Sequence, residues 1–149
     1  MLDAVNILIQ SPRPDIQSLL KDAGDSGRGW SPLSWAAFNG HLEVVKVLCM
    51  TGRIDAQLAS VDKRGQNAVS LAADRNHAEI VKVLVTFYPP GVDYPEESGR
   101  TPLSCAMWGC SSNAQIVRTL LQTGLVDVNR RAVNGGHHCL TQLLREGPI

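Results

Sequence analysis

Apolar side chains recur at helical spacing in three separate stretches of the chain, residues 41–48, 77–84 and 113–120. In each stretch, apolar positions three and four residues apart would form one face of an α-helix, with charged or polar residues between them. Gly52 and Gly124 follow the first and third stretch at the same offset, as glycines that end helices do. Each stretch therefore predicts an amphipathic helix.

A shorter helix is predicted before each of these. Segments 29–37, 65–73 and 99–107 share a leading glycine, a hydroxyl or amide residue, Pro or Ala, an aliphatic residue, Ser, and a later Ala. Ser31-Pro32 and Thr101-Pro102 combine an N-cap hydroxyl with proline at the first helical position, and Asn67 keeps the cap alone. The leading glycines, at positions 29, 65, 99 and 135, lie 36, 34 and 36 residues apart. The chain is thus an array of helix-turn-helix units.

Segment 29–48, with the pattern G-x-S-P-L-S-W-A-A-x-x-G-H-L-E-V-V-K-V-L, resembles the ankyrin repeat, a unit of roughly 33 residues with a T-P-L-H-x-A core. The resemblance covers nearly the whole chain. The repeat pattern is similar in particular to that of ankyrin arrays in fungal proteins. Ser34, Ser70 and Ser104 stand where the family has a His that ties adjacent turns together. We therefore expect that tie to be shorter or absent.

The resemblance implies an all-α ankyrin-repeat solenoid, with about three full repeats between degenerate caps. We expect a single domain over residues 1–149: an N-terminal cap unit at 1–25, repeats at 26–61, 62–95 and 96–131, and a truncated C-terminal cap at 132–149. End units of a solenoid face water on one side, so atypical sequences are expected there.

Composition excludes several classes of function. Lys plus Arg and Asp plus Glu number 14 each, so there is no basic excess of the kind that nucleic-acid binding requires. No apolar run approaches the roughly 20 residues that span a bilayer, and the first residues do not resemble a signal peptide. We expect an intracellular protein, cytoplasmic or nuclear, monomeric on its own and without a cofactor, whose cysteines are free thiols.

A metal site is the first chemical hypothesis to weigh. The candidate ligands are Cys105, Cys110, His137, His138 and Cys139. Their spacing matches no compact zinc finger. In the repeat alignment Cys105 takes the position of Leu71, and Cys139 takes that of Leu33. Both positions are apolar, and free cysteine packs as a small hydrophobe, so packing is favoured over metal.

Catalysis finds even less support, because a Ser or Cys nucleophile needs a base and an orienting group within reach. His41 and His77 occupy the Gly-His position of the repeat, where capping and packing explain them. Glu96 and Glu97 are expected on a solvated turn. No phosphate-binding glycine motif occurs, and we expect no enzymatic activity.

Ankyrin arrays bind partners through a concave face made of the turn tips and the outer positions of the first helices. Position by position, the resemblance assigns to this face Arg28, Trp30, Phe38, Asn39, Lys63, Arg64, Gln66, Asp74, Arg75, Glu97, Ser98, Arg100 and Trp108. The framework requires no aromatic at 30, 38 or 108, so we expect Trp30 to contact a partner. For Phe38 and Trp108, binding and packing are equally favoured, whereas Trp35 falls at a core position.

Five of these side chains, Arg28, Lys63, Arg64, Arg75 and Arg100, would make the face basic and suited to an acidic or phosphorylated protein segment. A solvated rim of mixed charge, with Asp74 and Glu97 interspersed, is an equal alternative. The sequence therefore predicts a non-catalytic protein–protein interaction module, acting as an adaptor, an inhibitor or part of a larger regulatory protein. The alternative is a small-ligand-binding protein or enzyme that uses the groove near Trp30, Trp108, His137 and His138.

Overall fold

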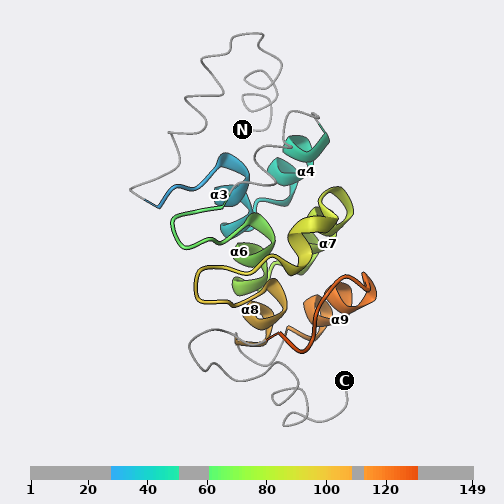
Figure 1. Ribbon diagram of the computed structural model, residues 1–149. Helices are drawn as coiled ribbons and strands as arrows, with labels where there is room; N and C mark the ends of the chain where they lie inside the picture. The colour runs from blue at the N-terminus through green and yellow to red at the C-terminus, as the bar shows by residue number, and fades with distance from the viewer. Residues whose placement is uncertain (1–27, 51–60, 109–112, 131–149) are drawn as a thin grey trace.

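The computed structural model describes residues 28–50, 61–108 and 113–130, and within these ranges the chain forms two layers of helices (Figure 1). The first layer contains α3 (Pro32–Phe38), α6 (Ala68–Asp74) and α8 (Pro102–Trp108). The second contains α4 (Leu42–Met50), α7 (Ala78–Phe87) and α9 (Ala114–Gln122), and the 3-10 helix η1 (Pro89–Asp93) follows α7. No helix in these ranges has the length and hydropathy needed to cross a bilayer.

The helix pairs stack in chain order. Helix α6 packs against both α3 and α8, and α7 packs against both α4 and α9. The turns that precede α6 and α8 project from the first layer, on the side away from the second (Figure 1). This arrangement confirms the predicted all-α solenoid of helix-turn-helix units.

The predicted N-caps are present. The Ser31 hydroxyl accepts a hydrogen bond from the backbone N–H of Ser34 (3.1 Å), and the Asn67 Oδ1 accepts one from that of Ser70 (2.8 Å). Thr101 caps α8 in the same way. The side chains of Ser34 and Ser70 also bond to their own cap residues, at 3.0 and 3.1 Å. These serines therefore stabilise their own helix starts.

Other groups connect consecutive units. The backbone N–H of Lys63 donates to the carbonyl of Arg28 (3.0 Å), and that of Glu97 donates to the carbonyl of Arg64 (2.9 Å), so the turn tips bond edge to edge. Between the layers, a ring nitrogen of His77 lies 3.1 Å from the carbonyl oxygen of Phe38 in the preceding unit. The packing role expected for His77 is thus confirmed.

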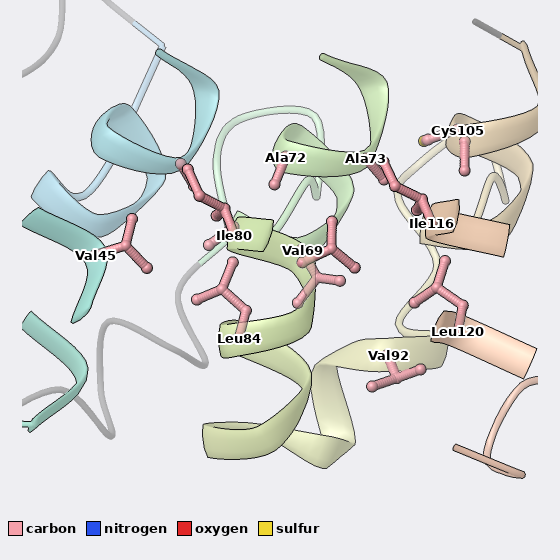
Figure 2. Close-up of a cluster of buried hydrophobic side chains, with 14 of the residues drawn as sticks. Val45, Val69, Ala72, Ala73, Ile80, Leu84, Val92, Cys105, Ile116 and Leu120 are labelled. Carbon is pink, nitrogen blue, oxygen red and sulfur yellow. The ribbon is translucent and has the colours of Figure 1, made fainter. Parts of the chain in front are cut away.

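One apolar core runs through the stack (Figure 2). It combines small residues of the first layer with branched residues of the second, among them Ala72, Ile80, Leu84 and Leu120, all buried. The small side chains let α6 approach α8 closely. Cys105 is fully buried in this core, as the packing interpretation predicted.

One core prediction is wrong. Trp35 is 40% exposed, with its ring against that of His41 (centroids 5.3 Å apart). Leu71, at the same repeat position on α6, lines a cavity together with residues of the preceding unit, so this position faces the N-terminal side of its helix pair. Residues 1–27, which precede this unit in the chain, lie outside the described residues.

Candidate partner-binding face

A surface cavity of about 440 Å³ lies where the turn tips meet the first-layer helices. Its lining comes from three consecutive units: Arg28, Trp30, Phe38, Asp62, Lys63, Arg64, Gln66, Leu71, Asp74, Arg75 and Arg100. Nine of these eleven residues are positions that the sequence assigned to the partner-binding face. The stacking of repeats thus brings together side chains that lie up to 72 residues apart in the chain (28 to 100).

Trp30 forms part of the cavity wall. Its side chain is only 7% exposed. The indole Nε1–H donates to the Asp62 Oδ2 at 3.0 Å, and the ring packs against Phe38 with centroids 4.5 Å apart. Trp30 thus joins one unit to the next, and its contact with a partner stays a prediction.

Asp62, which sequence reasoning missed, organises the turn before α6. Its Oδ1 accepts hydrogen bonds from the backbone N–H groups of Arg64 and Gln66, both at 2.8 Å, and its Oδ2 accepts one from the Trp30 indole N–H. The residue is 8% exposed, and its charge is satisfied by three donors. Asp62 and Glu96 both stand three residues before a leading glycine, and this shared offset is the signal that could have identified them.

Glu96 plays the corresponding role in the next turn and is buried, which corrects the expectation that it is solvated. Burial raises the pKa of its carboxyl, but hydrogen bonds from Arg100, Ser98 and Gln66 outweigh that effect and hold the pKa below its ordinary value. The same bond to Glu96 raises the pKa of Arg100. Arg100 is therefore paired within the framework.

Two guanidinium groups lie on the aromatic pair. Arg28, in the first turn, lies over the Trp30 ring at 4.9 Å from its centroid. Arg75, the C-cap residue that follows α6, lies over the Phe38 ring at 3.9 Å from its centroid. Such cation–π contacts hold the planar groups against the rings. The result is a layered cluster, Arg28–Trp30–Phe38–Arg75, at the cavity wall.

Comparison with known families identifies the architecture. A family model described as ankyrin repeats in three copies matches residues 1–94 and 53–132. The chain belongs to the ankyrin-repeat family. Ankyrin repeats are in general protein-interaction modules, and the cavity lies on the face formed by their turn tips and first helices. The search of curated proteins found no match.

Three assigned positions whose side chains the structure describes, Asn39, Glu97 and Ser98, do not line the cavity. Asn39 is exposed and donates from Nδ2 to the Trp35 carbonyl (2.9 Å), so it caps the end of α3. Ser98 bonds to Glu96, and Glu97 is exposed at the turn tip. Trp108 is the last residue of α8, and its side chain lies outside what the structure describes.

Of the five candidate metal ligands, only Cys105 lies among the described residues. Cys105 is in the core, whereas Cys110, His137, His138 and Cys139 lie outside the described residues. In the ranges that are described, no three His, Cys, Asp or Glu side chains form a group that could hold a metal ion. Cys49 is a buried free thiol, and burial raises its pKa to about 11, which keeps it protonated and unreactive at neutral pH.

Proposed function

We propose that the chain is a non-catalytic protein–protein interaction module that binds its partner at this cavity, as an adaptor, an inhibitor or part of a larger regulatory protein. The supporting observation is the convergence of nine independently assigned positions from three repeats around one cavity. We also propose a cytoplasmic or nuclear location, which the buried free thiols of Cys49 and Cys105 support because these compartments are reducing.

The charge of the lining favours an acidic partner segment. Five cationic side chains line the cavity, against the two carboxylates of Asp62 and Asp74. The chain as a whole has a net charge of zero, so the basic character is local. Charge complementarity of this kind speeds association and selects partners.

Lys63→Glu combined with Arg64→Glu tests the proposal by partner capture and mass spectrometry. Both side chains are exposed, and the Asp62 contact uses the backbone of Arg64, so the fold should be kept. The matched control is Lys82→Glu with Arg118→Glu, the same charge change on the exposed surface of the second layer. We expect the first variant to lose partners that wild type and control retain. Equal recovery by all three would refute the proposed binding face.

A small-ligand or enzymatic site ranks second. The cavity volume of about 440 Å³ falls within the roughly 300–1,000 Å³ of small-molecule sites. Those sites, however, are mostly apolar, whereas only Trp30, Phe38 and Leu71 provide apolar side chains here. His137 and His138, which this alternative also uses, lie outside the described residues.

A further inference from the structure

We infer that the cavity binds one phosphorylated side chain, a phosphoserine or phosphothreonine in an extended segment of the partner. This inference rests on the proposed function and adds the chemical group that the cavity recognises. Three observations support it. They are the cations of the cavity that have no ion-pair partner among the described residues, the positions of Arg28 and Arg75 over aromatic rings, and the limited exposure of those rings.

Four of the five cations form no ion pair with the lining carboxylates. Asp62 uses both of its oxygens on three framework donors. Asp74 acts electrostatically on Arg100, which is already bonded to Glu96. Among the described residues, the ion pairs are Lys46–Glu43, Arg100–Glu96 and Arg130–Asp93. The remaining cations of the cavity, Arg28, Lys63, Arg64 and Arg75, therefore have no ion-pair partner in the described part of the chain.

Two of these four cations are held in place before any ligand arrives. Arg28 and Arg75 lie over the Trp30 and Phe38 rings, at 4.9 and 3.9 Å from the centroids. A guanidinium placed against a ring keeps the N–H donors at its edge available, and those donors match two oxygens of a phosphate. Less side-chain entropy is lost when such a group binds.

A phosphate group uses this arrangement better than a carboxylate does. It carries a charge of about −1.5 to −2 at neutral pH and three strong acceptor oxygens, whereas a carboxylate carries one charge and two oxygens. Several cations from separate turns of the array converge on a single cavity, and one carboxylate would leave most of them without a partner. The number of donors therefore favours a phosphorylated residue over a single Asp or Glu.

The aromatic rings argue against a nucleic acid as the phosphate source. Single-stranded nucleic acids gain affinity by stacking bases on open aromatic faces. Here Trp30 is 7% exposed, and Arg75 covers a face of Phe38. The two rings of the cavity thus support arginines and offer no stacking platform for bases.

Fluorescence anisotropy with labelled, degenerate peptides tests this inference. Three pools of short peptides carry phosphothreonine, threonine or glutamate at one fixed position. We expect the phosphothreonine pool to bind at least about tenfold more tightly than the other two, and Arg75→Gln to remove about tenfold of that affinity. Arg75→Lys, which keeps the charge and loses the planar group, should recover only part of it. Arg118→Gln, on the exposed surface of α9, is the control and should bind as wild type.

Equal binding of the phosphothreonine and glutamate pools, no binding of any pool, or tighter binding of a single-stranded oligonucleotide would each overturn the inference. Partner capture from a phosphatase-treated lysate separates this failure from failure of the proposed function. Suppose that partners are still captured after phosphatase treatment but are lost with the Lys63→Glu/Arg64→Glu variant. This result would refute phosphate recognition and would still support the proposed binding face. Arg28→Gln provides a second variant should Arg75→Gln not fold, as judged by its circular dichroism.

Discussion

The indole Nε1–H of Trp30 and the carboxylate of Asp62 form a hydrogen bond of 3.0 Å between two consecutive repeats, and both residues are buried. The same carboxylate holds two backbone N–H groups of the turn before α6. The Asp62 side chain thus fixes the shape of its own turn and also connects that turn to the preceding unit. Both residues line the cavity, so its shape depends on this contact.

Replacement of Asp62 should therefore destabilise the array. Asp62→Ala leaves three donors without an acceptor, of which the Trp30 indole N–H and the Gln66 backbone N–H are buried, and we expect a loss of roughly 2–5 kcal/mol in the free energy of unfolding. Urea denaturation measures the change. Asp74→Ala removes the same charge from an exposed position and should stay within about 0.5 kcal/mol of wild type. Equal effects of the two substitutions would contradict the role given to Asp62.

The second-layer helices should depend on their buried leucines. Leu84 is fully buried and Leu48 is 5% exposed, so truncation of either to alanine opens a cavity between stacked units. We expect a cost of roughly 2–5 kcal/mol for each, seen as a lower melting temperature. Leu125→Ala, at a side chain that is 54% exposed, is the control. Melting curves unchanged by Leu48→Ala and Leu84→Ala would contradict the packing of α4 and α7.

Gly40 is required for contact between units as well as for its backbone conformation. Its φ is +79°, and a Cβ placed there would lie 2.7 Å from the His77 ring, the ring that bonds to Phe38. Gly124 has a φ of +66° with nothing within 4 Å. Gly124→Ala should therefore cost about 1 kcal/mol for the backbone alone. Gly40→Ala should cost clearly more in chemical denaturation, and equal costs would show that His77 moves aside freely.

The buried Glu96 should make stability depend on pH. Its pKa lies below the ordinary 4.5, so the unfolded chain takes up a proton before the folded chain does. The stabilisation is complete above pH 4.5 and is lost as the pH falls through the lowered pKa. Asp93, whose pKa burial raises, acts in the opposite direction.

Glu96→Gln should therefore flatten the acid side of the stability profile, measured as the free energy of unfolding against pH. Glu97→Gln, at the exposed neighbour, should keep the wild-type profile. An acid slope that is the same in all three proteins would place the responsible carboxyl elsewhere.

Much of the fold could be predicted from the sequence because its signals are local. Ser31-Pro32, Asn67 and Thr101-Pro102 start helices through bonds to residues three positions further on, which any chain with that order can form. Apolar positions of α7 and α9 become buried because their spacing matches the helix. Gly124 ends its helix region with a positive φ for an equally local reason.

Nine of the eleven residues that line the candidate cavity could be predicted as well, because repeat alignment fixes which positions lie on the turn tips. Whether each of these side chains is buried, hydrogen-bonded or exposed could not be predicted from the sequence. Glu96 was expected on a solvated turn and is buried, while Trp35 was expected in the core and is 40% exposed. Trp30 was expected on the partner-binding face, and its ring is buried between two units. Asn39 was expected on the binding face and caps a helix end.

The sequence by itself determined the helices, their caps, the stacking order and nine of the residues that line the candidate cavity. Only the tertiary structure decided which of those residues support the framework and which remain available to a partner. The physical reason is that burial and charge pairing depend on contacts between units, such as Trp30 with Asp62, whose members lie 32 residues apart. Such contacts form only once two repeats have stacked.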